Sequence, residues 1–285
     1  MVPCIWYASK IAHPWERAMI GNMGAALRAR GVGLSIYTDG GTTDFCLDGV
    51  LSWRALTLLE RMRLILSSAG ALWHLWGEAP RWWGFVRMRS RTVHTSWRPN
   101  PVWRGHPSRI FTEQADDGET VIKPTFESRL AQPGEGADGS SSRAPAVYVN
   151  LASAKPALVK AISDLNCPVL DLGTGRFGAS SAKSGCLVSG DSPSEALLAA
   201  ALTLQGLAVV GPSSSYLRSL LGDEGYLSVE GDEEGAWRDA IAQALSERGR
   251  ALSTSARHVI KTRYSAAECA LSLEAMYRAV LEGIF

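Results

Sequence analysis

The second half of the chain alternates short apolar runs with helical segments, and this pattern limits the fold more than any other feature. The apolar runs read "AVYVNLA", "CPVLDLG", "GCLVSG", "LAVVG" and "GYLSVE". Between them the sequence predicts helices at 156–165, 193–205 and 214–221. Strands that alternate with helices pair in parallel and are covered on both faces. This half is therefore predicted to be a doubly wound α/β domain.

The first half follows the same logic less regularly. Helices are predicted at 18–31, where Gly31 is a plausible C-cap, at 54–68 and at 79–88. The apolar runs between and after them predict strands at 5–8, 33–41, 71–76, 91–97, 109–113 and 120–124. The chain of 285 residues suits two domains of about 130 residues each. We predict α/β domains at 1–130 and 146–265, both Rossmann-like, with a Gly-, Ser- and Pro-rich linker at 131–145.

Composition excludes several classes of protein. The net charge of +1 gives no general attraction to nucleic acid. Five scattered cysteines without a CxxC pair argue against a disulfide framework and against a zinc site. The first ten residues do not resemble a signal peptide, and no apolar run is long enough to span a membrane. We therefore expect a cytoplasmic protein.

Three loops of the second half follow predicted strands and could meet a ligand, because ligands of such sheets bind beyond the carboxyl ends of the strands. The first holds Gly173, Thr174 and Gly175, whose backbone amides could approach a phosphate, although taken alone these residues are better explained by a plain strand-to-helix turn. The second, at 192–195, opens a helix with a serine cap, and its Glu195 either closes that cap or meets a ligand. The third is the serine run 213–215, in which at least one serine is expected to cap a helix.

The order of segments in the second half resembles a known family. The segments "EALLAAALTLQGLAVVG", "SSSYLRSLLGDEGYLSVEGDEEGAWRDAIAQAL" and "ARHVIKTRYSAAECALSLEAMYRAVLEG" are similar to the C-terminal half of retaining, nucleotide-sugar-dependent glycosyltransferases of the GT-B fold, family 4 type. The resemblance is good over about 190–285, and in the first half it extends only to the order of elements. It implies two Rossmann-like domains facing a cleft, with the last helix, about 266–285, packed back on the first domain.

The resemblance also implies a set of site residues. Lys155 matches the family lysine that holds the donor diphosphate. Glu195 matches the first of two family glutamates and would hold the sugar hydroxyls, whereas the second glutamate would grip the ribose. Asn150, Ser194 and Ser213, together with the glycine loop at 173–175, would complete the donor site. A histidine at the end of a strand in the first domain would line the sugar site; His94 is the nearest candidate. The acceptor-side candidates of the first domain are His13, Glu16 and Trp97.

The chain departs from the family pattern at several of these positions. Asn150 stands where the family has an arginine, and a neutral amide replaces a bidentate charged fork. Alignment from Gly206 places Ala201 at the second glutamate. Trp97, rather than His94, occupies the best-aligned position for the histidine. These departures motivate an alternative function, a catalytically inactive glycosyltransferase-like binding or partner protein.

An aromatic and basic stretch at 81–109 is the other candidate for function. It contains seven arginines, four tryptophans and no acidic residue. Such a surface suits an anionic membrane, a phosphate-bearing acceptor, sugars or single-stranded nucleic acid. A plain core of tryptophans under solvated arginines is an equally good interpretation. Of the functional interpretations we favour a lipid-linked or phosphorylated acceptor, with peripheral contact at the inner face of a membrane, and we expect no nucleic-acid partner.

The leading hypothesis is therefore a hexosyltransferase with a retaining mechanism. It would move a hexose from a UDP- or GDP-sugar to an envelope glycan or glycolipid acceptor. No cofactor is expected, and no metal, because no acidic DxD motif lies in a suitable loop. A dinucleotide-dependent oxidoreductase is disfavoured, since the first strand is not followed by GxGxxG.

Overall fold

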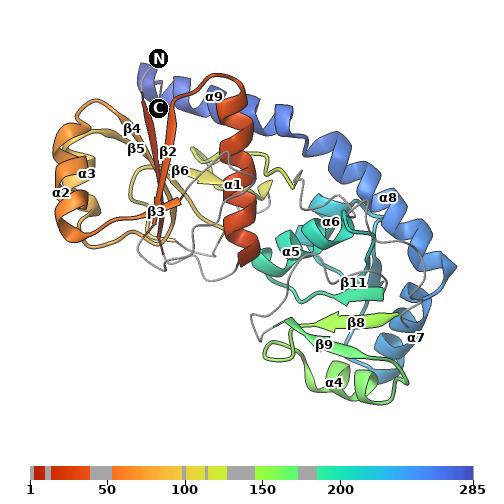
Figure 1. The fold of residues 1–285 in the computed structure, drawn as a ribbon. Coiled ribbons are helices and arrows are strands. Elements are labelled where there is room, and N and C mark those ends of the chain that lie inside the picture. The colour runs from red at the N-terminus through yellow and green to blue at the C-terminus, as the bar shows by residue number, and fades with distance from the viewer. Residues whose placement is uncertain are drawn as a thin grey trace, which may run out of the picture. The chain divides into compact units, whose positions relative to one another are not determined.

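The protein contains two compact units in the computed structural model (Figure 1). The structure describes residues 3–9, 14–38, 53–97, 101–112, 115–126, 145–172 and 185–284. Unit 1 comprises residues 1–125 and 266–285, and unit 2 comprises residues 126–265. Each unit has its own parallel sheet and its own core.

Unit 1 is built on a seven-stranded parallel sheet with the strand order β3-β2-β1-β4-β5-β6-β7. The order reverses beside β1, so β1 and β4 form the topological switch point of this sheet. Its elements are β1 (Cys4–Ser9), α1 (Pro14–Ala29), β2 (Leu34–Thr38), β3 (Trp53–Ala55), α2 (Leu58–Ser67), β4 (Leu72–Gly77), α3 (Trp83–Arg89), β5 (Arg91–Thr95), β6 (His106–Arg109), β7 (Thr120–Val121) and α9 (Ala266–Glu282).

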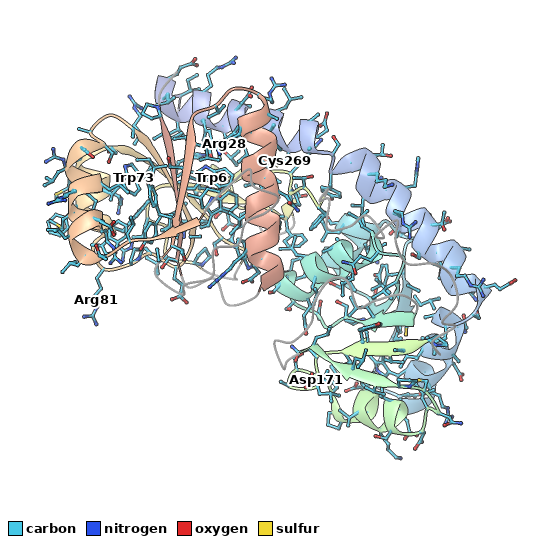
Figure 2. All side chains as sticks on the ribbon, in the orientation of Figure 1. Trp6, Arg28, Trp73, Arg81, Asp171 and Cys269 are labelled. Carbon is cyan, nitrogen blue, oxygen red and sulfur yellow. The ribbon has the colours of Figure 1, made fainter. Side chains whose placement is uncertain are left out.

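Different helices cover the two faces of this sheet. Because side chains alternate along each strand, neighbouring residues of one strand pack against different helices. Tyr7 of β1 and Trp73 of β4 pack in one cluster with Ile65 of α2 and Trp83 of α3. The opposite face carries α1 and α9, which contact each other. Figure 1 shows α2 and α3 on one side of the strands and α1 on the other. Trp6, whose ring is fully buried, lies beside His74 on the face covered by α9 (Figure 2).

Helix α9 is held in unit 1 by both apolar and polar contacts. Cys269, Leu273 and Met276 are buried on its inner face. Its exposed edge carries two ion pairs, Lys123 with Glu268 at 2.7 Å and Arg30 with Glu274 at 2.5 Å. The last helix of the chain thus completes the fold of the first unit.

Unit 2 is built on a five-stranded parallel sheet with the order β12-β11-β10-β8-β9. Its switch point lies between β8 and β10, which pair directly. Its elements are β8 (Ala146–Val149), α4 (Pro156–Ser163), β9 (Val169–Asp171), β10 (Gly185–Val188), α5 (Pro193–Thr203), β11 (Ala208–Pro212), α6 (Ser215–Leu221), β12 (Leu227–Val229), α7 (Glu234–Ala244) and α8 (Glu247–Arg263).

The strands of unit 2 are apolar on both faces, as expected for a parallel sheet between two helical layers. Val147 and Val149 of β8 face a cluster that includes Ile162 of α4 and Trp237 of α7. Helices α5, α6 and α8 contact one another and form a second layer.

The predicted fold class is confirmed, and several element boundaries were wrong. Helix α1 begins at Pro14 rather than at 18, and α3 begins at Trp83 rather than at 79. Helix α2 begins at Leu58 rather than at 54, because Thr57 and Glu60 form a capping box and residues 53–55 pair with β2 as a strand. The strand predicted at 109–113 is instead β6 at 106–109, whose register with β5 pairs His106 with Val93. The C-cap at Gly31 is confirmed: its φ is 83°, and its N–H donates to the carbonyl of Arg28.

We predict that Leu273→Ala weakens the packing of α9 strongly, whereas Leu271→Ala on the same helix does not. Leu273 is fully buried, and Leu271 is 46% exposed. Removing a buried leucine costs about 2–5 kcal/mol, because a cavity remains. Urea denaturation followed by tryptophan fluorescence reports unit 1. Equal losses of unfolding free energy in the two variants would contradict this arrangement of α9.

Candidate functional site

The loops at the switch point of unit 2 bring Asn150, Lys155 and Glu195 to one edge of the sheet. The loop after β8 contains Asn150 and Lys155, and the segment after β10 leads into α5 at Ser192. Because β8 and β10 are parallel neighbours, their carboxyl ends lie at the same edge of the sheet. A hydrogen bond joins the two loops: Ser153 Oγ donates to Glu195 Oε1 at 2.7 Å.

The loop after β8 is shaped by its own backbone and by β9. The side-chain oxygen of Asn150 accepts a hydrogen bond from the N–H of Ala152 at 3.3 Å, which closes a tight turn. The Asn150 carbonyl accepts from both the N–H and the hydroxyl of Ser153. Asp171, at the end of β9, accepts from the N–H of Leu151 at 3.1 Å. Asn150 therefore supports the loop through its amide oxygen.

Glu195 is held by two serines at the start of α5. Ser192 caps the helix by accepting from the Glu195 N–H, and its hydroxyl donates to Glu195 Oε2 at 2.8 Å. The predicted cap, with Pro193 in the first turn, is thereby confirmed. A Cβ added at Gly190 would lie 2.2 Å from Glu195 Oε2, so the carboxylate occupies the space that this glycine leaves open. A carboxylate has about four acceptor positions, and two are used here.

Lys155 places a cation at this edge of the sheet. It precedes α4, and its Nζ lies 3.6 Å from a carboxylate oxygen of Asp232. Both side chains are more than half exposed, so the pair is weak and open to exchange. A stronger pair at 2.6 Å joins Lys160 of α4 to Glu234 of α7.

The remaining donor-side residues occupy varied positions. Ser214 caps α6 by accepting from the N–H of Tyr216, which confirms that one serine of the run has a capping role. Ser213 is exposed beside it, and Ser194 is partly buried in the first turn of α5. Ala201 is partly buried on α5 and supplies no carboxylate. The glycine loop 173–175 lies outside the described residues.

In unit 1 the structure joins two of the acceptor-side candidates. Glu16, in the first turn of α1, accepts a hydrogen bond from the indole N–H of Trp97 at 3.0 Å. Both side chains are buried, and Trp97 follows the end of β5. They lie near the carboxyl edge of the sheet. His13 falls outside the described residues.

His94 lies on β5 with both ring nitrogens engaged. Its Nε2 donates to the carbonyl of Gly77 at 2.7 Å, and its Nδ1 accepts from the N–H of Arg104 at 3.1 Å. These partners fix one neutral tautomer. Burial lowers the pKa of His94, and the Gly77 carbonyl opposes that shift only in part. In this state the histidine orders the loop that contains Arg104.

A buried polar chain that the sequence did not indicate crosses unit 1. His74 of β4 contacts the hydroxyl of Tyr277 on α9 at 2.5 Å and the hydroxyl of Thr95 at 2.6 Å. Thr95 in turn is hydrogen-bonded to Ser108 of β6. The His74 ring stacks on Trp76 at 4.2 Å between centroids. Full burial lowers the pKa of His74 well below its usual range.

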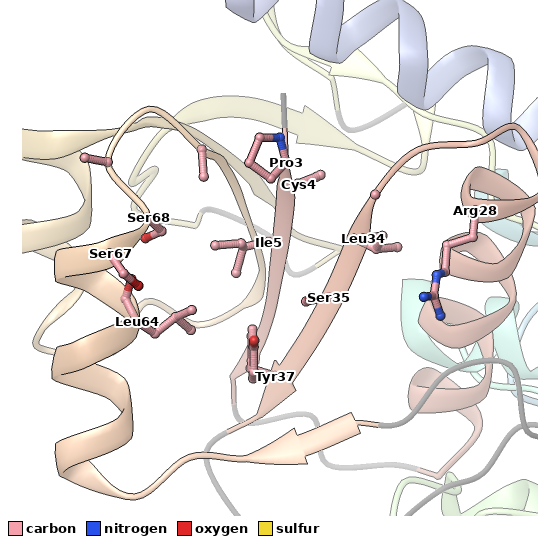
Figure 3. Close-up of a pocket in the computed structure, with 13 residues that line it drawn as sticks. Pro3, Cys4, Ile5, Arg28, Leu34, Ser35, Tyr37, Leu64, Ser67 and Ser68 are labelled. Atoms are coloured by element: carbon pink, nitrogen blue, oxygen red, sulfur yellow. The ribbon is translucent and has the colours of Figure 1, made fainter. Parts of the chain in front are cut away.

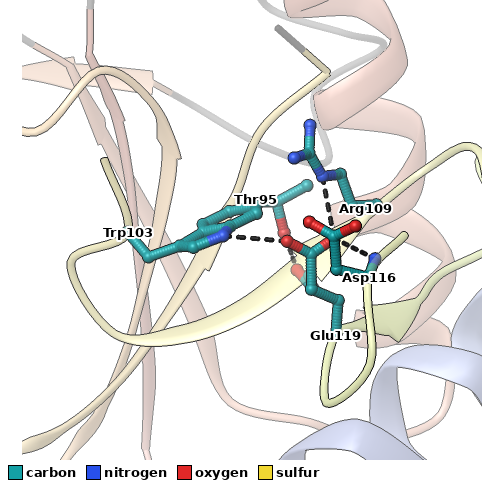
Figure 4. Close-up of polar contacts among 6 residues, drawn as sticks. Thr95, Trp103, Arg109, Asp116 and Glu119 are labelled. Carbon is teal, nitrogen blue, oxygen red and sulfur yellow. Dashed lines mark hydrogen bonds and ion pairs between the residues drawn. The ribbon is translucent and has the colours of Figure 1, made fainter. Parts of the chain in front are cut away.

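A second buried cluster lies next to it at the end of β6 (Figure 4). Arg109 Nε and Glu119 Oε2 form an ion pair at 2.9 Å, and both side chains are about 95% buried. Glu119 also accepts from the indole N–H of Trp103 at 2.8 Å, and the Arg109 guanidinium lies 4.9 Å from the centre of the Trp103 ring. Trp103 meets the edge of His94. Glu119 and Arg109 thus hold the Trp103 ring in position against the ring of His94.

A hollow of about 510 Å³ lies at the opposite edge of the unit 1 sheet (Figure 3). Pro3, Gly33 and Ala71, which precede β1, β2 and β4, line it together with Ser68. It therefore opens at the amino ends of the strands. Ligands of doubly wound sheets bind at the carboxyl ends, so we do not assign the site to this hollow.

Among the residues that the structure describes, no group of three or more His, Cys, Asp or Glu side chains is arranged to hold a metal ion. Nor is any helix of these segments both long enough and apolar enough to cross a membrane.

Solved structures of the same architecture are glycosyltransferases of the GT-B fold. No protein-family model matches the sequence, and no curated protein matches it significantly. A glycosyltransferase from Rickettsia africae matches with a TM-score of 0.70 at 13% identity, over 98% of this chain and 99% of its own. HepE from Anabaena, in complex with UDP and glucose, matches with a TM-score of 0.68 at 8% identity, over 98% and 100%.

A third similar structure is WaaG, a glycosyltransferase involved in lipopolysaccharide biosynthesis. Its TM-score is 0.62 at 10% identity, over 96% of this chain and 99% of its own. At such low identities the similarity establishes the fold. The chain thus has the α/β fold of GT-B glycosyltransferases over nearly its whole length.

The buried histidines predict a loss of stability in mild acid. A histidine whose pKa is lowered in the folded state binds its proton more readily when unfolded, where the pKa is about 6.5. Its contribution is complete above that pH and decreases as the pH falls towards the folded pKa. Urea denaturation between pH 7.5 and 5.5 should show this decrease. His94→Gln should reduce the slope by up to about 1.4 kcal/mol per pH unit. An unchanged slope would show that His94 does not stay neutral in the fold.

The ion pair of Arg109 and Glu119 predicts a second, separate effect on stability. Glu119→Gln leaves a buried guanidinium without its counter-charge and should cost about 3–5 kcal/mol of unfolding free energy. The control is Glu268→Gln, which breaks the pair with Lys123, where both side chains are nearly half exposed. That change should cost about 1 kcal/mol or less. Similar losses in the two variants would argue against burial of the Arg109 pair.

Proposed function

We propose that this protein is a glycosyltransferase that moves a hexose from a UDP- or GDP-sugar to an envelope glycan or glycolipid, with retention of configuration. The observation that carries the proposal is the polar loop at the switch point of unit 2, where Lys155 lies at the same sheet edge as Glu195. The fold supports it, because the similar structures are glycosyltransferases and HepE was solved with UDP and glucose.

Departure of the nucleoside diphosphate is the step for which this loop is suited. Negative charge develops on the leaving diphosphate as the sugar bond breaks, and a cation with preorganised N–H donors stabilises that charge. Lys155 supplies the cation after exchanging Asp232 for the diphosphate. The N–H groups at the capped start of α5 supply donors together with the positive end of the helix dipole. Asn150 contributes less than an arginine would, because its amide is neutral and lacks the paired N–H donors of a guanidinium.

Glu195 is the residue that we assign to the sugar. Its carboxylate is fixed by Ser153 and Ser192 and keeps acceptor capacity for hydroxyl groups. Ser194 and Ser213 would add hydroxyls on the donor side, as would the glycine loop 173–175. Fixing the carboxylate in advance reduces the cost of orienting the sugar.

On the acceptor side, the proposal assigns unit 1. Glu16 and Trp97 would form the wall of that site as a hydrogen-bonded pair, with His94 behind it and His13 on the loop before α1. An envelope acceptor is suggested by one structural neighbour, WaaG, which is involved in lipopolysaccharide biosynthesis. No metal ion or other cofactor is part of this scheme, so donor binding should be insensitive to EDTA.

A non-catalytic binding or partner protein is the second candidate. It is favoured because the polar groups of the candidate site already have partners within the protein. Asn150 closes its own turn, Lys155 faces Asp232, and both ring nitrogens of His94 are hydrogen-bonded. A protein of this kind would retain the nucleotide site and lack sugar transfer. It differs from the first candidate in activity and not in the location of the ligand.

The donor site is tested by calorimetric titration of the purified protein with UDP, GDP and their common sugars. We expect one nucleotide to bind, and we expect Lys155→Ala to weaken it by about tenfold or more, the usual effect of losing a hydrogen bond to a charged group. Lys160→Ala is the matched control, because Lys160 is also an ion-paired lysine but lies farther along α4.

The acidic partners give a test in the opposite direction. Asp232→Asn removes the anion that competes for Lys155 and should tighten diphosphate binding by about threefold or more. Glu234→Gln, which releases Lys160, should leave affinity unchanged. Absence of binding to every nucleotide from folded protein would refute the donor site. Binding with hydrolysis or transfer favours the transferase, and binding without turnover favours the second candidate.

A further inference from the structure

Exposed apolar side chains are concentrated on two neighbouring helices of unit 1. Of the thirteen large apolar side chains that are exposed among the described residues, six belong to α2 and α3. Their exposed fractions run from 44% to 75%. They are Leu58, Leu59, Met62 and Leu66 of α2, and Phe85 and Met88 of α3. Concentration of this kind marks an interaction surface rather than ordinary scatter.

The two helices present these side chains on one side of the molecule. Both pack on the same face of the sheet, through Ile65 of α2 and Trp83 of α3. The guanidinium of Arg61 lies 5.2 Å from the ring of Trp82 near their first turns, and the hydroxyl of Ser90 donates to the carbonyl of Ser68 at their last turns. These contacts at both ends show that the helices run side by side in the same direction.

Helical spacing places the apolar residues of α2 on its outer surface. Leu59, Met62 and Leu66 recur at intervals of three and four residues, which puts them on one face of a helix. Phe85 and Met88 follow the same spacing on α3, opposite the buried Trp83 and Val86. The inner surface of each helix is thus used by the core, and the outer surface is also apolar.

Arginines are interspersed with these apolar side chains. Arg63, Arg87 and Arg89 are exposed on the two helices, and Arg81 extends outward just before α3 (Figure 2). The acidic residue of α2, Glu60, is engaged in the capping box with Thr57. An apolar face bordered by arginines is the pattern of a helix that lies in a membrane interface.

The sequence placed a basic and aromatic surface at 81–109, but the structure buries part of that stretch. In the stretch 81–109, Trp83 and Trp97 are buried, so the tryptophans largely serve the core. Arg109 is buried in its ion pair with Glu119. Within the described residues of the stretch, α3 exposes Phe85, Arg87, Met88 and Arg89 together, and its neighbour on the surface is α2, which precedes the stretch in sequence.

We infer that α2 and α3 together form a docking face for an anionic lipid surface. Apolar side chains enter the headgroup region, and the arginines contact lipid phosphates. A second copy of the chain suits this face less well. In a two-fold contact, the same patch would meet itself and bring arginine against arginine. This inference does not depend on nucleotide binding or on sugar transfer.

The test is flotation of the full chain with vesicles, without any nucleotide. One set contains phosphatidylcholine alone, and the other contains roughly 30% phosphatidylglycerol. We expect flotation with the anionic vesicles at about 0.05 M salt and weaker flotation at about 0.5 M salt, since salt screens the arginine contribution. The triple variant Leu59→Ser, Leu66→Ser and Met88→Ser should lower the partition coefficient by about tenfold or more.

Charge is tested with a second variant, which leaves the apolar residues in place. Arg63→Glu with Arg87→Glu should also lower partitioning by about tenfold or more, since each arginine near an anionic surface contributes about fivefold. Arg63→Lys with Arg87→Lys should retain it. The matched controls are Leu271→Ser on α9 and Arg250→Glu on α8, which replace exposed residues elsewhere.

Three outcomes would overturn the inference. One is flotation no stronger than with phosphatidylcholine alone. Another is an equal loss in the control variants. The third is a dimer in sedimentation equilibrium that the triple variant converts to a monomer, since the face would then be covered by a second copy. Because nucleotide is absent, failure here leaves the proposed donor site untouched.

Discussion

The parallel pairing of β8 with β10 is the constraint on which the candidate donor site depends. These strands are not consecutive in sequence, and their adjacency reverses the strand order of unit 2. The reversal leaves a position at the carboxyl edge where the two following loops diverge to opposite faces of the sheet. Asn150, Lys155 and Glu195 gather there from segments about 40 residues apart, and Ser153 bridges them. Without this pairing the same residues would share no surface.

Unit 1 depends on a comparable long-range element, the last helix. Helix α9 returns after the whole of unit 2 and places Tyr277 against His74 in the interior of the first sheet. From His74 the polar chain continues through Thr95 to Ser108 and ties three strands to the helix. Buried polar groups of this kind are favourable only when each has a partner, so the chain specifies one position for α9. At the end of β6, the buried charges of Arg109 and Glu119 likewise satisfy each other and so specify one arrangement of that segment.

Burial separates the aromatic residues of unit 1 from its basic residues. Most of the tryptophans that the structure describes in full lie inside, and Trp6, Trp73, Trp76 and Trp83 are among the largest fully buried side chains. Large aromatic rings on both faces of a sheet need helices packed over each face to exclude water, and α2 and α3 cover one of the two faces. Those helices then have an apolar outer surface as well as an inner one. The docking face proposed above follows from that excess of apolar residues over what the core can use.

Much of the fold could be predicted from local patterns. Alternation of apolar runs with helices predicted parallel sheets, and the caps at Gly31, Ser192 and Ser214 follow from residue types that satisfy free backbone groups. Boundaries were less predictable. The helix expected from 54 begins at Leu58, because pairing of residues 53–55 with β2 outweighs their helical pattern. The strand expected at 109–113 lies at 106–109, because its register is set by β5.

The sequence by itself determined the α/β class, the capped starts of α5 and α6, and the residue types available at the candidate site. Only the tertiary structure decided which of them meet: Ser153 with Glu195, Lys155 with Asp232, and Glu16 with Trp97. It also decided that Arg109 is buried while Arg63 and Arg87 are exposed, and that His94 is held as a neutral ring. The reason is physical. Periodicity and capping act over a few residues and can be read along the chain, whereas contacts between strands and burial depend on segments far apart in sequence.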